Sequence, residues 1–233
     1  MEPIRVATWN VGWTSSGSRH FAKSRALIEE TRADLLVLTE TTLSMVPAGG
    51  YLVKGGPDWG YETTPERRKV MLWSRWPATD VSNEIVEPGG RHVCATVESP
   101  IGGLRFHAVC VPWSQAHVSG GRENRRVWED HHGFLVELRE LLRREAAESR
   151  TSGLPLIVAG DINQREQPKP YGSHKVRKLW AETLEEARIS LGTDPEMIDQ
   201  IAVGHGLAAS DSRIYPPEKM SDHHAVSCLV TPA

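Results

Sequence analysis

Residues 154–164, LPLIVAGDINQ, run from a mostly apolar segment into Gly160 and then present Asp161 and Asn163. A short apolar run that ends at a glycine is typical of a buried β-strand. Side chains two positions apart on a strand point to the same face. The stretch therefore predicts a rigid strand that carries a carboxylate and a carboxamide toward one common ligand.

On either side of this strand the sequence pattern varies along the chain. The first part predicts strands linked by a helix, residues 69–113 predict consecutive antiparallel strands, and the remainder again alternates helices with strands. This mixture predicts an α/β (α+β) four-layer sandwich, in which two mainly antiparallel sheets pack face to face and helices flank them. We expect a single domain over residues 1–233. The expected strands are 4–10, 34–40, 69–78, 79–87, 91–99, 103–113, 155–161, 198–204 and 223–230, and the expected helices are 19–33, 122–148 and 175–190.

Composition excludes several classes of protein. The net charge of −3 and the pI near 6.4 provide no global positive field for a polyanion, so local patches or a metal ion must bind one. No segment has the length or pattern of a membrane span or a secretory leader. The three cysteines are an odd number without a CxxC pair, which argues against a disulfide framework. We expect a reduced, cytoplasmic protein without membrane insertion, and a monomer by default.

Polar residues stand at the ends of five expected strands. Strand ends are where α/β proteins collect reactive groups, because the scaffold is rigid there and the adjoining loops vary freely. Several hard oxygen ligands without a thiolate or triple-histidine cluster select Mg²⁺ or Mn²⁺, and a histidine beside an acid suits chemistry on a phosphate. The pattern favours hydrolysis of phosphate esters. The residues are Asn10, Glu40, Asp161, Asn163, Asp199, Asp222 and His223.

Five short motifs in the same order resemble those of the endonuclease/exonuclease/phosphatase superfamily, which has the deoxyribonuclease-I-like fold. The motifs are spread along nearly the whole chain, and five of them in the expected order are stronger evidence than any one alone. The motifs are TWNV (8–11), LLVLTE (35–40), VAGDINQ (158–164), IDQI (198–201) and SDHHAV (221–226).

The resemblance implies a role for each residue of the set. Glu40 is the expected principal Mg²⁺ (or Mn²⁺) ligand, with Asn10 and Asp222 binding directly or through water. Asp161 orients or deprotonates the attacking water, and Asn163 holds a non-bridging phosphate oxygen. His223 contacts the scissile phosphate and Asp199 fixes its imidazole. The role of general base is left shared between the aspartate and the histidine.

The chain departs from the family pattern at Cys110, where relatives carry a tyrosine or histidine. A thiol is a poorer hydrogen-bond donor than a phenol or an imidazole. Trp113, Gln115 or His117 in the following loop are candidate substitutes. Arg122, at the start of the expected helix 122–148, is a candidate phosphate ligand, and a solvated helix face is the alternative explanation.

We therefore expect a divalent-metal-dependent phosphoesterase that hydrolyses phosphodiester bonds, with a nuclease acting on DNA or RNA as the first expectation. A phosphatase or phosphodiesterase of a small substrate is the alternative, acting on an inositol phosphate, a nucleotide or a phospholipid head group. A binding scaffold with impaired catalysis is a third possibility, suggested by Cys110 alone.

Overall fold

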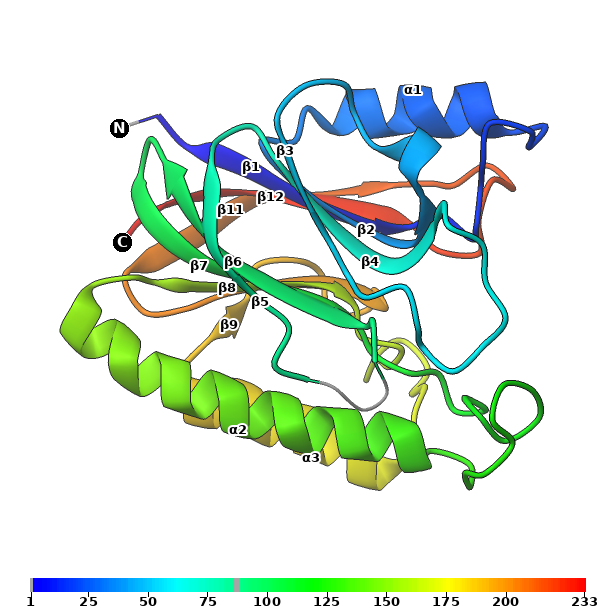
Figure 1. Cartoon of the computed structure of the whole chain (residues 1–233). Helices are drawn as coiled ribbons and strands as arrows, with labels where there is room; N and C mark the ends of the chain where they lie inside the picture. The colour runs from blue at the N-terminus through cyan, green and yellow to red at the C-terminus, as the bar shows by residue number, and fades with distance from the viewer. Residues whose placement is uncertain (1, 86–88) are drawn as a thin grey trace.

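Two six-stranded sheets pack face to face in the computed structural model, which describes residues 2–85 and 89–233 (Figure 1). One sheet, called sheet A, has the strand order β11-β12-β1-β2-β4-β3. Its strands are β1 (Ile4–Asn10), β2 (Leu35–Thr42), β3 (Tyr51–Lys54), β4 (Arg67–Ser74), β11 (Leu207–Tyr215) and β12 (Ala225–Pro232).

The other sheet, called sheet B, has the order β5-β6-β7-β8-β10-β9. Each sheet contains one parallel pair, β1 with β2 and β7 with β8, and its other pairs are antiparallel. The strands of sheet B are β5 (Ala78–Ser82), β6 (His92–Ser99), β7 (Gly102–Cys110), β8 (Leu156–Asp161), β9 (Ser190–Leu191) and β10 (Asp199–Val203).

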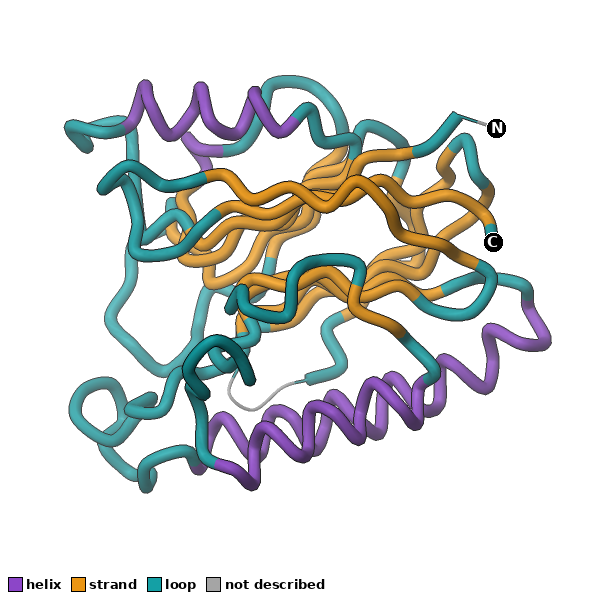
Figure 2. The backbone as a smooth tube through the Cα atoms, turned by 180° about the vertical axis from the view of Figure 1, so that it is seen from behind, coloured by secondary structure: helices purple, strands orange, loops and turns teal. Residues whose placement is uncertain are grey.

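Helices cover the outer faces of both sheets, as the tube in Figure 2 shows from behind. Helix α1 (Phe21–Thr31) lies on sheet A, and α2 (Glu129–Ser152) and α3 (His174–Ala187) lie side by side on sheet B. A 3₁₀ turn, η1 (Leu43–Met45), follows β2. The four-layer sandwich expected from the sequence is confirmed. Among the described helices, none combines the length and the apolar character that crossing a bilayer requires.

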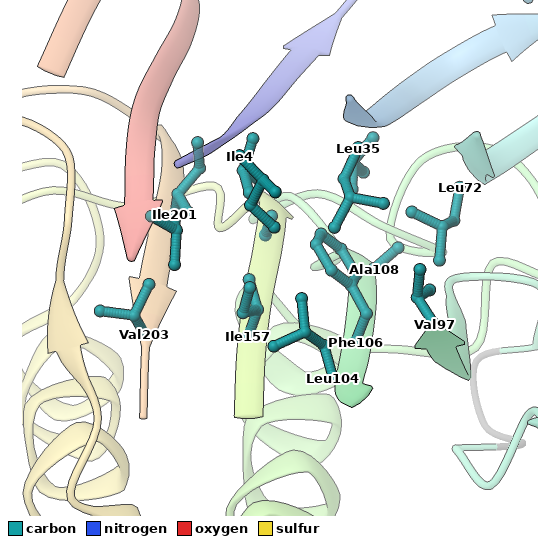
Figure 3. Close-up of a cluster of buried hydrophobic side chains, with 14 of the residues drawn as sticks. Ile4, Leu35, Leu72, Val97, Leu104, Phe106, Ala108, Ile157, Ile201 and Val203 are labelled. Carbon is teal, nitrogen blue, oxygen red and sulfur yellow. The ribbon is translucent and has the colours of Figure 1, made fainter. Parts of the chain in front are cut away.

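The main core lies between the two sheets, where alternate residues of each strand meet. On β6, for example, Val93, Ala95 and Val97 point inward, whereas His92 and Cys94 point toward the helices. Figure 3 shows this inter-sheet cluster. The side chains labelled there are Ile4, Leu35, Leu72, Val97, Leu104, Phe106, Ala108, Ile157, Ile201 and Val203.

The long helix begins at Glu129, so the prediction that it begins at residue 122 is wrong. Residues 112–128 form a loop instead, because Gly120, Gly121 and Trp128 adopt positive φ angles of 117°, 67° and 69°. Buried His117 anchors this loop: its Nδ1 lies 2.5 Å from Asp130 Oδ2. Arg122 consequently lies in a loop and does not open a helix.

Two differences concern strands. β5 ends at Ser82, and the last two positions of the strand expected over 79–87 lie outside the described residues. β3, β9 and β11 were not predicted, and Ser190, the first residue of β9, falls in the range expected for a helix. In β11 most side chains between Leu207 and Tyr215 are at least partly exposed, so the sequence there lacks the apolar alternation of a half-buried strand.

Phe106→Ala tests how far the inter-sheet core determines stability. The ring is fully buried between the sheets, so its removal leaves a cavity, and we expect a loss of about 3–5 kcal/mol of unfolding free energy in urea denaturation. Val136→Ala on the exposed face of α2, where the side chain is 41% exposed, is the control and should change stability by less than about 0.5 kcal/mol. Equal losses for the two variants would contradict this description of the core.

Candidate active site

The candidate site lies where strands of both sheets end at the same edge of the sandwich. Asn10 is the last residue of β1 and Asp161 the last of β8, while Asp199 is the first of β10. Asp161 and Asp199 are direct partners in the β8–β10 register. His223 lies in the turn that leads into β12. Four segments far apart in the sequence therefore meet at one point.

Gly160 explains how Asp161 reaches this position. Its φ is 146°, and a Cβ there would lie 1.8 Å from the main-chain oxygen of Val109 on β7. Only glycine permits this close approach of β7 and β8. The glycine of the AGDIN stretch thus brings the end of β8 against its neighbour and aims the following carboxylate between the sheets.

Asp161 is fully buried and accepts hydrogen bonds from both neighbouring amides. Asn10 Nδ2 donates to Asp161 Oδ2 at 2.9 Å, and Asn163 Nδ2 donates to the same oxygen at 3.0 Å. The main-chain N–H of Asn163 donates to Oδ1 at 2.9 Å. Asn163 Nδ2 also donates to the Val111 oxygen at 2.9 Å, which holds the side chain in place. These donors fix the orientation of the carboxylate.

His223 is held by Asp199. The two side chains meet at 2.5 Å between Nδ1 and Oδ2, and Asp199 Oδ1 accepts from the main-chain N–H of Asn10 at 2.9 Å. The indole of Trp9 donates to the His223 carbonyl at 3.0 Å. With Nδ1 bound to Asp199, the other ring nitrogen, Nε2, is left for a ligand.

The charges of this cluster act on one another. Burial lowers the pKa of His223, but the facing carboxylates of Asp161 and Asp199 outweigh it and raise the pKa well above its ordinary value. The pKa of Asp161 is raised overall. Burial is the largest cause, the charge of His223 opposes it, and the charge of Asp199 adds to it. A raised imidazole pKa means that His223 is positively charged at neutral pH, so the cluster offers a cationic group toward a bound anion.

Glu40 lies in the same site on sheet A. Its φ of 45° interrupts the β2–β4 pairing, which continues at Thr39 and Thr41. Lys69 of β4 is buried and donates from Nζ to Glu40 Oε1 at 2.5 Å. Glu40 also contributes to raising the pKa of Asp161, so the two carboxylates share one electrostatic environment.

The donor set fits a hard divalent cation. Glu40, Asp222 and the amide of Asn10 carry the oxygen atoms that the sequence nominates as ligands, and beside them Asp161, Asp199 and His223 have ligand atoms within 4.8 Å of one another. The chemistry of the donor set, oxygen atoms of carboxylates and an amide, is the observation in favour, and the ammonium of Lys69 contacts Oε1 of Glu40.

The other predicted residues differ in their placement. Asp222 is exposed and lines an opening of 230 Å³ together with Asp199 and His223. Cys110 is fully buried beside Asp161 on the adjacent strand, and burial raises the pKa of its thiol. Trp113 is 43% exposed in the loop after β7. Arg122 is exposed and lies 3.9 Å from Asp58 in a neighbouring loop.

Three residues at the site were not predicted. Lys69 is one, and Arg91 is another: it is fully buried, and its main-chain oxygen accepts from Cys110 N at 2.8 Å, which places it beside Cys110. Tyr171 is the third. Burial raises the pKa of this phenol, and the charges of Asp161 and Asp222 raise it further. Of the three, only Lys69 could have been found from the sequence, since it lies in the basic stretch RRKV (67–70) at the start of β4. That pattern is also common on solvated strand edges, so it does not predict a site residue by itself.

An aromatic and basic group of side chains flanks Glu40. The indoles of Trp13 and Trp59 stack with centroids 5.4 Å apart. The guanidinium of Arg67 and the ammonium of Lys69 lie 5.1 and 5.0 Å from the Trp13 ring centroid, within the range of cation–π attraction. Trp59 and Lys69 are buried, whereas Trp13 and Arg67 are half-buried.

The fold and this cluster define a two-sheet α/β sandwich with an acid–imidazole site where the sheets end. The model of the endonuclease/exonuclease/phosphatase family matches residues 7–223, and the chain belongs to this family. Hydrolases of the family act on phosphate esters. No curated protein sequence matches the chain.

Several solved structures share the fold at low sequence identity. The 3′ phosphatase NExo from Neisseria, bound to a product DNA hairpin, is 19% identical with a TM-score of 0.69, over 97% of this chain and 98% of that one. The AP endonuclease LMAP from Leishmania major is 15% identical with a TM-score of 0.69, over 99% and 88%. The human Nocturnin catalytic domain with a bound sulfate anion is 16% identical with a TM-score of 0.68, over 99% and 95%.

Asp199→Asn tests the electrostatic coupling of the cluster. Removing the carboxylate that contacts Nδ1 should lower the pKa of His223, because a neighbouring negative charge stabilises the imidazolium. The measurement is an NMR titration of the imidazole, assigned with His223→Gln. Glu196→Gln, which neutralises an exposed acid lining the same opening, is the control and should leave the midpoint nearly unchanged. A midpoint unaffected by Asp199→Asn would contradict the coupling.

Proposed function

We propose that this protein is a Mg²⁺- or Mn²⁺-dependent phosphodiesterase, and specifically a nuclease that acts on DNA or RNA in the cytoplasm. The observation that carries the proposal is the convergence of Asp161, Asn163 and His223 on one point. Asn10 and Asp199 orient them, and Glu40 lies on the facing sheet. Membership in a family that hydrolyses phosphate esters supports it.

Each residue of the cluster has a definite task in this proposal. His223 binds a non-bridging oxygen of the phosphate as a cation. Asn163 donates to another once its amide releases the Val111 carbonyl, because its two N–H groups are otherwise used by Val111 and Asp161. Asp161, oriented by the two amides, accepts a hydrogen bond from a water and aligns it opposite the leaving oxygen. Asp199 keeps the imidazole in place. The buried position of the cluster strengthens each of these electrostatic contacts.

The proposed reaction is hydrolysis. A bond forms between the water oxygen and phosphorus, and the bond from phosphorus to the leaving oxygen breaks. The proton lost by the water passes to Asp161, because His223 is already protonated while it binds the phosphate as a cation. A proton then returns to the leaving oxygen.

Glu40, Asn10 and Asp222 are the proposed residues that hold the metal. When bound, a divalent cation neutralises developing charge on the phosphate oxygens. Lys69 must release Glu40 as the metal binds, since its ammonium contacts the same carboxylate.

Two observations bear on the substrate. The half-buried guanidinium of Arg67, which lies over the Trp13 ring near Glu40, suits a phosphate of a nucleic-acid strand. This favours a nucleic acid. The opening beside His223, of only 230 Å³, and the net charge of −3 favour the second candidate, a phosphatase or phosphodiesterase of a small ester.

Asp161→Asn tests the proposed activity. With Mg²⁺ and bis-p-nitrophenyl phosphate we expect the variant to lose about 10²–10⁴-fold in kcat, because an amide cannot accept the proton of the water. Chelation of the metal should abolish wild-type activity. Glu196→Gln, an exposed acid outside the cluster, should retain activity and serves as the control. Activity that survives both Asp161→Asn and chelation would refute the assignment.

The same wild-type and Asp161→Asn proteins separate the two substrate classes. Single- and double-stranded DNA, RNA, nucleotides and inositol phosphates are compared by kcat/KM at equal phosphate concentration. The proposal expects the highest value with an oligonucleotide. A preference for a monomeric ester would select the second candidate instead.

A further inference from the structure

A second group of chemically capable side chains lies on the outer face of sheet B, away from Asp161. His92 and Cys94 are two positions apart on β6 and so share a face, and His107 of β7 is the direct cross-strand partner of Cys94. All three are fully buried beneath helix α2. The proposed hydrolysis uses none of them. We call these three residues the His92 cluster.

The ligand atoms of the His92 cluster already converge. His92 Nε2 lies 3.1 Å from His107 Nδ1, and a set of one ligand atom from each of the three residues lies within 4.8 Å of one another. Zinc binds histidine nitrogen at about 2.0–2.1 Å and cysteine sulfur at about 2.3 Å, so two nitrogens on a tetrahedral zinc are roughly 3.4 Å apart. The observed separation of the imidazole nitrogens is close to that spacing.

Neighbouring residues orient the cluster as they do in metal sites. His107 Nε2 contacts Glu145 Oε2 at 2.8 Å, an arrangement in which the ring donates to the carboxylate and leaves Nδ1 as a lone pair toward His92. Arg105 Nη2 donates to Cys94 Sγ at 2.8 Å. Burial keeps the pKa of this thiol above its ordinary value, although the charge of the guanidinium lowers it in part. Arg105 is in turn paired with Glu145 at 3.1 Å.

Hydrogen bonds alone leave this cluster incomplete. Once His107 Nδ1 is an acceptor, His92 Nε2 must be the donor of the contact between the two rings. Nδ1 of His92 is then buried without a hydrogen-bond partner among the residues that the structure describes. The other two fully buried histidines of the described chain, His107 and His131, have partners on both ring nitrogens. Zinc bound to His92 Nε2 does not contact this Nδ1, so the case for a bound ion rests on the convergence of the three ligand atoms.

We propose that His92, Cys94 and His107 bind one zinc ion, with water as the fourth ligand, at a site distinct from the proposed catalytic centre. Two imidazoles and a thiolate select zinc over magnesium, because Mg²⁺ prefers oxygen ligands. The bound ion joins β6 to β7, and through His107 and Glu145 it also fastens α2 to sheet B. Its role is therefore to stabilise the fold.

The surrounding surface provides a way in for the ion. An opening of 390 Å³ is lined by Arg105 and Glu145, which both contact the cluster. Asp80, Glu84 and Glu148 also line it, so its rim carries carboxylates that attract a cation. An accessible path of this kind is needed for a metal to reach a buried site in the folded protein.

Titration with Co²⁺ tests the proposal in the full-length protein, in the presence of excess Mg²⁺ to occupy the oxygen-rich site. Cobalt replaces zinc in tetrahedral sites, and a cysteine ligand produces a thiolate-to-cobalt charge-transfer absorption. We expect this absorption to saturate at one equivalent in the wild type and to vanish when Zn²⁺ displaces the cobalt.

The three cysteines provide matched variants. Cys94→Ser should lose the absorption, while Cys110→Ser and Cys228→Ser should retain it, although all three thiols are buried. Glu145→Gln should keep the absorption but weaken binding by about 10–100-fold, because it removes the carboxylate that orients His107. Zn²⁺ should raise the Tm of the wild type and leave that of Cys94→Ser unchanged.

No stoichiometric absorption in the wild type would overturn the proposal, as would its loss in Cys110→Ser in place of Cys94→Ser. The wild-type and Cys110→Ser titrations decide the question even if Cys94→Ser does not fold. Because no step of the experiment measures hydrolysis, its result is independent of the proposed nuclease activity.

Discussion

The site depends on a carboxylate that the fold buries completely. Placing Asp161 between two apolar sheets removes it from water, and an isolated buried charge is costly. The chain offsets this cost with two amides, from Asn10 and Asn163, and with the imidazolium of His223. Because these partners come from β1, from the segment after β8 and from the turn before β12, the charge can be satisfied only when both sheets are assembled.

The same constraint explains the arrangement of cations near the site. Cys110 lies between Asp161, on the adjacent strand β8, and Arg91, which immediately precedes β6, and the charge of Lys69 on sheet A acts on it. The neutral thiol of Cys110 thus occupies the position at which members of the family are expected to carry a tyrosine or histidine. Two buried cations, Lys69 and Arg91, lie around it. The phenol of Tyr171, whose pKa the charges of Asp161 and Asp222 raise, comes from the loop between β8 and α3. Lys69, Arg91 and Tyr171 are therefore hydrogen-bond donors that do not depend on residue 110.

The sequence predicted the sandwich and most of the cluster because both follow from local patterns. Apolar runs that end in a polar residue mark β1, β2 and β8, and the order of the motifs located Asp199 and His223. The predicted start of α2 was wrong because the arginines after Gly121 have ordinary helix propensity. A contact between His117 and Asp130, which are not neighbours in sequence, holds these residues in a loop instead. Lys69, Arg91 and Tyr171 were missed for the same reason. Their roles arise from strand pairing and loop packing, which no local pattern encodes.

The central claim is that Glu40 and its neighbours form one divalent-metal site at the edge of the sandwich. The most direct measurement is an anomalous difference map from a crystal of the protein soaked in Mn²⁺. We predict a single strong peak within coordination distance of Glu40 at this edge, with the Lys69 ammonium moved off the carboxylate. An intact Lys69–Glu40 ion pair at full Mn²⁺ saturation, with no peak beside it, would contradict the account.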